Sequence, residues 1–164
     1  MRYIFKILIL GLPEVTPVYV SYAFNEEGED KGSYIEYYRE ISVLKDMCDL
    51  EIDVITDLIN VDYDEIIPIV DGIIYFLNPI NKEEIEFFEM ILPIINSVKR
   101  NLPMVVIYFD PKGIIPIPVN ELLEDLWTRY PQLEGFVNLR PRDFHQAIQC
   151  LCMAMIAGDT PLNI

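Results

Sequence analysis

Gly11-Leu12-Pro13-Glu14-Val15-Thr16-Pro17-Val18 follows directly on the apolar run Ile4 to Leu10, and this junction decides how the chain is interpreted. A phosphate-binding loop, G-x-x-x-x-G-K-[ST], would lie at such a place. In that loop, backbone N–H groups cradle the phosphates, the lysine reaches the β and γ oxygens, and the hydroxyl holds Mg²⁺. Here the second glycine, the lysine and the hydroxyl are replaced by Thr16, Pro17 and Val18.

Other residues of the same stretch also oppose anion binding. Pro13 and Pro17 have no backbone N–H to offer. Glu14 places a negative charge where phosphates would have to sit. If the surrounding fold is a nucleotide-binding fold, its ligand site has been dismantled.

The length and composition predict a single domain over residues 1–164, long enough to bury its own core. No apolar run reaches the roughly 18 residues that span a bilayer, so we expect no membrane insertion. Lys6 interrupts the apolar opening, which therefore predicts a buried strand rather than a signal sequence. Three cysteines, an odd number, favour a reducing compartment, and the expected location is the cytoplasm.

The charge is strongly acidic, with 12 basic against 27 acidic residues and a net charge of −15. A field of this sign repels nucleic acid and anionic lipid, so neither is an expected partner. It also opposes triphosphate binding, and the only close basic pair, Lys99-Arg100, is expected to close a helix.

Strand-length apolar stretches alternate with helical patterns, which predicts an α/β fold with a mostly parallel sheet covered on both faces. The expected strands are Phe5 to Leu10, Tyr37 to Leu44, Leu50 to Thr56, Gly72 to Leu77, Met104 to Phe109 and Phe136 to Leu139. The expected helices are Val18 to Glu27, Asp62 to Val70, Lys82 to Lys99, Asn120 to Tyr130 and Asp143 to Ala157. The second and third strands form a hairpin, so one strand runs antiparallel. Asn25 to Gly32 is expected to be a solvated acidic loop.

Two of these helices have predicted inward faces. The helix from Lys82 is expected to be capped by Asn81 and kinked at Pro93. Its inward residues are expected to be Ile85, Phe88, Leu92, Ile95 and Val98. In the helix from Asn120 they are Leu123, Leu126 and Trp127.

The order strand, loop, helix, hairpin and three further strand–helix units resembles that of the Ras-like small GTPases. Val70 to Gly113 is similar to that family's fourth strand, third helix and fifth strand. Leu102 to Ile107 resembles its Val-Pro-Met-Val-Leu-Val strand. The resemblance implies a three-layer αβα Ras-like G-domain, with a six-stranded mostly parallel sheet and one antiparallel strand.

The nucleotide motifs of that family fail in this chain. Its D-x-x-G becomes Asp57-Leu58-Ile59-Asn60, its N-K-x-D becomes Phe109-Asp110-Pro111-Lys112, and its S-A-K becomes Asn138-Leu139-Arg140. Ser33 is the only candidate for the switch hydroxyl. We therefore expect no catalytic, cofactor-binding or metal-binding residue, and no cofactor.

Other candidate sites favour structural roles. Cys150 and Cys152 point to different sides of a helix and are expected to be buried apolar residues, while His145 is expected to be a surface or half-buried helix residue. The acidic clusters at 26–30 and 62–65 lack calcium-loop spacing. The apolar segment Gly113 to Val119 either folds back onto the body or forms an exposed ridge for a partner. Tyrosines near the first helix and hairpin fit an interface or the core; they are Tyr19, Tyr22, Tyr34, Tyr37 and Tyr38.

Three hypotheses follow. The first is a pseudo-GTPase that acts as a protein–protein interaction module, with an active small GTPase, a roadblock- or longin-type domain or a scaffold subunit as its partner. The second is a divergent GTPase that binds nucleotide through noncanonical groups, with Thr16 and Asp57 on the Mg²⁺ side. The third is a receiver-like or flavodoxin-like signalling domain, with which the predicted hairpin fits poorly.

Overall fold

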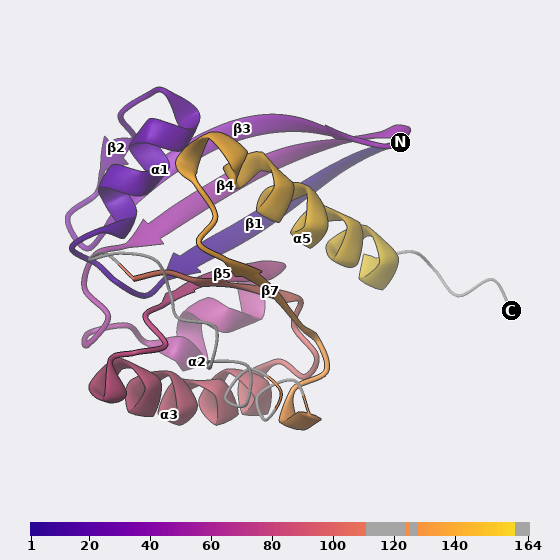
Figure 1. Ribbon diagram of the computed structural model, residues 1–164. Coiled ribbons are helices and arrows are strands. Elements are labelled where there is room, and N and C mark those ends of the chain that lie inside the picture. The colour runs from indigo at the N-terminus through magenta and orange to yellow at the C-terminus, as the bar shows by residue number, and fades with distance from the viewer. Residues whose placement is uncertain (111–123, 125–127, 160–164) are drawn as a thin grey trace, which may run out of the picture.

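The computed structural model describes residues 1–110, 124 and 128–159, which form one seven-stranded sheet with helices packed on both faces (Figure 1). The strands are β1 (Arg2–Leu10), β2 (Glu29–Asp30), β3 (Tyr34–Val43), β4 (Asp46–Ile55), β5 (Gly72–Leu77), β6 (Met104–Tyr108) and β7 (Leu133–Val137). The helices are α1 (Thr16–Phe24), α2 (Tyr63–Ile66), α3 (Lys82–Val98) and α5 (Phe144–Asp159), with 3₁₀ turns η1 (Ile67–Ile69) and η3 (Pro141–Asp143).

The sheet is mostly parallel, with the strand order β2-β3-β4-β1-β5-β6-β7. Parallel pairs join β4 to β1, β1 to β5, β5 to β6 and β6 to β7. β3 runs antiparallel to both β4 and β2. The predicted α/β class and the predicted hairpin are confirmed.

The expected number of six strands is wrong, because a seventh lies in the segment predicted to be a loop. Glu29 and Asp30 pair with Glu36 and Ile35 along the outer edge of β3. An edge strand leaves backbone donors and acceptors unpaired, and the returning chain satisfies some of them. All four acidic residues of this segment are nevertheless exposed, as expected of a solvated region; they are Glu26, Glu27, Glu29 and Asp30.

β1 is the central strand and divides its side chains between two cores. Alternate residues of a strand face opposite sides of the sheet. Ile7 and Ile9 enter the core beneath α1 and α5, whereas Leu8 and Leu10 enter the core beneath α2 and α3. All four side chains have no exposed surface, which is why this strand has a continuous apolar sequence.

Several predicted boundaries needed correction where single residues adopt left-handed backbone. Asn25, with φ 51°, ends α1 by donating its N–H to the carbonyls of Ser21 and Tyr22, so the helix covers Thr16–Phe24 rather than Val18 to Glu27. Asn138, with φ 53°, follows β7, which ends at Val137 rather than Leu139. Asparagine adopts this conformation more readily than most residues do.

α3 and its neighbours agree closely with the prediction. Asn81 caps α3 by accepting hydrogen bonds from the backbone N–H groups of Glu83 and Glu84, at 3.0 and 3.3 Å. Lys99 ends the helix, and its Nζ donates to the carbonyl of Val70 at 2.7 Å. The buried residues of α3 are Phe88, Ile91, Leu92 and Ile95, while Ile85 and Val98 are half-buried.

Two predictions fall outside what the structure describes. The segment Gly113 to Val119 lies there, as does most of the helix expected from Asn120 to Tyr130, including Leu123, Leu126 and Trp127. Within the described parts of the chain, no helix combines the length and the apolar character that crossing a membrane requires.

Candidate functional site

The turn after β1 is shaped by two successive residues with left-handed backbone. Gly11 has φ 90° and Leu12 has φ 43°. A Cβ atom at Gly11 would lie 2.0 Å from the carbonyl oxygen of Phe76 on β5, a distance that no side chain tolerates. The first glycine of the phosphate-loop pattern is therefore required here by the close approach of a neighbouring strand.

The polar groups of this turn are largely bound to one another. The backbone N–H groups of Val15 and Thr16 both donate to the carbonyl of Leu12, at 2.9 Å each. The Thr16 hydroxyl donates to the carbonyl of Gly11 at 2.7 Å, and its side chain is fully buried. Pro13 has no N–H to add. Two of the amides that could cradle a phosphate are thus bound within the turn, and a third is missing at Pro13.

A cavity of about 500 Å³ lies beside this turn, at the carboxyl ends of β1, β5 and β6. Ligands of open α/β sheets bind at such an edge. Three carboxylates line it, from Glu14, Glu84 and Asp110, and the described lining residues include no lysine or arginine. This charge would repel a polyphosphate.

Glu84 on α3 is the most perturbed of the three carboxylates. Burial, followed by the negative charge of Glu14, raises its pKa above the usual value. Its Oε2 atom is buried and has no hydrogen-bond partner among the described residues. The ionised form of Glu84 is therefore destabilised in this cavity. A bound nucleotide would add further negative charge close to it.

An aromatic cluster occupies the region next to the ends of β6 and β7, where the resemblance places base-reading loops. The Tyr19 ring lies 4.9, 5.8 and 5.4 Å from the rings of Phe76, Phe109 and Phe144, in edge-to-face arrangements. The Tyr19 hydroxyl donates to the carbonyl of Leu139 at 2.6 Å. Burial and the charge of Asp143 raise the pKa of Tyr19, so this phenol stays protonated. The cluster ties α1 to both segments by packing.

The structure does not bring Thr16 and Asp57 together in one cavity. Asp57 accepts a hydrogen bond from Asn60 Nδ2 at 2.7 Å and lines a separate hollow of about 300 Å³ that also includes Ser33. The Thr16 hydroxyl points instead into the turn after β1.

The remaining predicted positions do not line this cavity. His145 is exposed on α5 and Cys152 is buried, as expected. Cys150, which was also expected to be buried, is only half-buried. Asp62 caps α2, and the neighbouring Asp64 and Glu65 are exposed.

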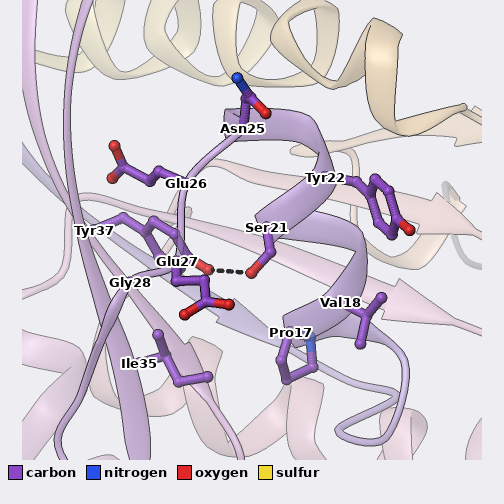
Figure 2. A pocket seen from close by; sticks show the side chains of 10 residues that line it. All are labelled: Pro17, Val18, Ser21, Tyr22, Asn25, Glu26, Glu27, Gly28, Ile35 and Tyr37. Atoms are coloured by element: carbon purple, nitrogen blue, oxygen red, sulfur yellow. Dashed lines mark hydrogen bonds between the residues drawn. The ribbon is translucent and has the colours of Figure 1, made fainter.

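The five tyrosines divide between core and surface. Tyr19 and Tyr37 are buried, Tyr34 is half-buried, and Tyr22 and Tyr38 are exposed. An open groove of about 650 Å³ runs between α1 and β3, where Ser21 and Tyr37 share a hydrogen bond of 2.9 Å (Figure 2).

One cluster of chemically active side chains was missed by sequence reasoning. Carboxylate oxygens of Glu36, Glu51 and Asp53 lie within 4.8 Å of one another on β3 and β4, beside Lys6 of β1. The sequence offered one signal, since Glu51 and Asp53 alternate with apolar residues along one strand. Their neighbours Lys6 and Glu36 could not be identified, because they depend on the register of the strands.

Comparison of the chain with protein-family models and with curated proteins found no match.

Proposed function

We propose that this chain is a pseudo-GTPase, a Ras-like domain that neither binds nor hydrolyses GTP and acts as a protein–protein interaction module. The element order supports the proposal: strand, turn, helix, hairpin and then further strand–helix units, around a sheet with one reversed long strand. This is the order on which the resemblance to the Ras-like proteins rests.

The proposed loss of nucleotide binding rests mainly on one observation, the structure of the turn after β1. Its Val15 and Thr16 amides bind the carbonyl of Leu12, and the cavity beside it is lined by carboxylates. Catalysis in GTPases consists almost entirely of positioning and stabilising phosphate charge. A turn with two of its amides bound internally and an acidic cavity beside it is poorly suited to either task.

Loss of nucleotide binding has a consequence for the mode of action. A GTPase switches because its γ-phosphate orders segments that are released on hydrolysis. Without that ligand, the proposed module keeps one conformation, fixed by packing, and presents a constant surface. The partner we propose is a protein of the cytoplasm: a small GTPase, a roadblock- or longin-type domain, or a scaffold subunit.

A divergent GTPase is the second candidate, with Thr16 and Asp57 as Mg²⁺-side residues. The separation of these two residues into a buried turn and a different hollow weighs against it. The receiver-like alternative is disfavoured by the antiparallel β3, since that class of domain has an all-parallel sheet.

Thermal unfolding in the presence and absence of GTP, GDP and Mg²⁺ tests the nucleotide half of the proposal. A ligand at about 100 times its Kd stabilises a protein by about 2.7 kcal/mol, or roughly 5–10 °C for a domain of this size. The proposal predicts an unchanged Tm, and a rise of that size with either nucleotide refutes it. Affinity capture of the tagged chain from its native host, followed by mass spectrometry, tests the interaction half.

A further inference from the structure

One face of the hairpin and β1 carries charged side chains in place of an apolar core. Glu51 and Asp53 of β4 lie on the side opposite the core beneath α1 and α5, because strand residues alternate. Lys6 on β1 is in register with Glu51, and Glu36 on β3 is in register with Asp53. We refer to these four side chains, Lys6, Glu36, Glu51 and Asp53, as the acidic patch.

The charges in the acidic patch do not balance. Lys6 Nζ lies 3.2 Å from Glu51 Oε1 and 3.1 Å from Asp53 Oδ2. Its ammonium group therefore contacts two of the three carboxylates, and oxygens of all three lie within 4.8 Å of one another. The patch therefore holds one basic group against three acidic ones.

Asp53 lacks a donor that it needs. Only 3% of the residue is exposed, and its Oδ1 atom is buried without a hydrogen-bond partner among the described residues. Buried polar atoms nearly always have such a partner. Burial and the charges of Glu51 and Glu36 raise the pKa of Asp53, although Lys6 acts in the opposite direction.

The surroundings of the acidic patch include exposed apolar groups. Ile4, on the same side of β1 as Lys6, is 82% exposed, and Tyr38, in register with Glu51, is 65% exposed. Farther along the same strands, Arg2 binds Asp49 at 2.7 Å and also contacts Glu40. Exposed aromatic side chains such as Tyr38 are enriched at protein interfaces, and a polar, charged rim surrounds the centre of such interfaces.

We propose that this face docks a basic segment of a protein partner and places an arginine guanidinium among the carboxylates of Glu36, Glu51 and Asp53. A guanidinium has five N–H donors in a planar fork and binds carboxylates bidentately, so it suits a patch with surplus acceptors. Ile4 and Tyr38 contact the apolar neighbours of that arginine. The net charge of −15 accelerates the approach of such a partner. This inference rests on the proposed interaction function and names its partner chemistry.

Selection from a displayed library of random peptides against the full chain tests the inference. The selected peptides are then measured against the double variant Glu36→Gln/Glu51→Gln and a control, Asp64→Asn/Glu86→Gln, which removes the same charge from exposed positions on α2 and α3. We expect arginine-rich sequences whose affinity falls about tenfold or more with the first pair and is unchanged with the second. The single variant Asp53→Asn should also bind the selected peptides more weakly. Urea unfolding confirms that each variant is folded.

Four results overturn the inference. One is a selected set without basic residues, and another is equal binding to the double variant and its control. The third is saturation of Glu36, Glu51 and Asp53 by CaCl₂ alone, followed through carboxylate NMR signals, because it assigns the patch to a metal ion. Peptides that bind another face, such as the groove of Figure 2, also refute the inference but leave the proposed interaction function standing. Nucleotide binding, by contrast, refutes that function without bearing on the patch.

Discussion

The hydroxyl of Thr16 donates a hydrogen bond to the carbonyl oxygen of Gly11, across the turn that joins β1 to α1. In a phosphate-binding loop the corresponding region directs its donors outward, toward the ligand. Here the donor is turned inward and serves the turn itself. The local backbone is therefore stabilised by its own side chain, with no need of a bound anion.

Replacement of Thr16 by alanine is expected to destabilise the protein by about 1–3 kcal/mol, because it leaves the buried carbonyl of Gly11 without a donor. Urea unfolding followed by circular dichroism measures the effect. Thr16→Ser keeps the hydroxyl and should lose only the contribution of a buried methyl group, about 1 kcal/mol. Equal losses for the two variants would show that the hydrogen bond does not matter.

Gly11→Ala is expected to cost about 3 kcal/mol or more, since it combines a left-handed backbone with a collision against the Phe76 carbonyl. Gly32 is the matched control, because it has φ 96° but no atom lies within 4 Å of the place that a Cβ would take. Gly32→Ala should cost only the backbone strain, about 1–2 kcal/mol. Comparable unfolding free energies for both variants would contradict the close approach of β5.

The fold could be predicted well wherever one strong local signal decided the structure. β5 was placed residue for residue because its apolar run is bounded by Asp71 and Asn78, and the start of α3 was placed correctly because Asn81 is a strong N-cap. β2 could not be predicted, because Glu29 and Asp30 have no intrinsic strand preference and become a strand only by pairing with the edge of β3.

Part of the candidate site could be predicted, because that part depends on neighbouring residues in the sequence. The lack of phosphate-binding groups in the turn after β1 could be recognised from its prolines and Glu14, which are local features. The acidity of the adjacent cavity could not, because it depends on Glu84 from the first turn of α3 and Asp110 from the segment after β6. The acidic patch likewise requires the register that places Lys6 beside Asp53.

Tyr19→Phe is expected to destabilise the protein by about 1 kcal/mol, through loss of the hydrogen bond to the carbonyl of Leu139. Tyr22→Phe, on the exposed face of the same helix, should change the unfolding free energy by less than about 0.5 kcal/mol. Chemical denaturation of both variants tests whether the aromatic cluster anchors the segment after β7. No difference between them would argue against that role.

Glu84→Gln is expected to stabilise the protein at neutral pH, by roughly 0.5–1 kcal/mol given its partial exposure. The pKa of Glu84 in the folded state is raised above its usual 4.5, so the folded state holds this proton more tightly than the unfolded state does. The wild-type protein therefore loses stability as pH rises through the window between the two pKa values.

The advantage of Glu84→Gln should accordingly disappear below about pH 4, where the carboxyl is protonated in both states. Glu83→Gln removes a charge from an exposed neighbour on α3 and serves as the control. The unfolding free energy of Glu84→Gln should exceed that of Glu83→Gln at neutral pH. In acid the two unfolding free energies should become similar. A destabilised Glu84→Gln at neutral pH would mean that the carboxylate has a favourable partner.

Isothermal titration of the full chain with GTP and with GDP, each in the presence of Mg²⁺, measures the central claim most directly. The occupied amides of Val15 and Thr16 and the carboxylates of Glu14, Glu84 and Asp110 predict no saturable heat with either nucleotide. Binding of GTP or GDP with micromolar or tighter affinity would contradict the account.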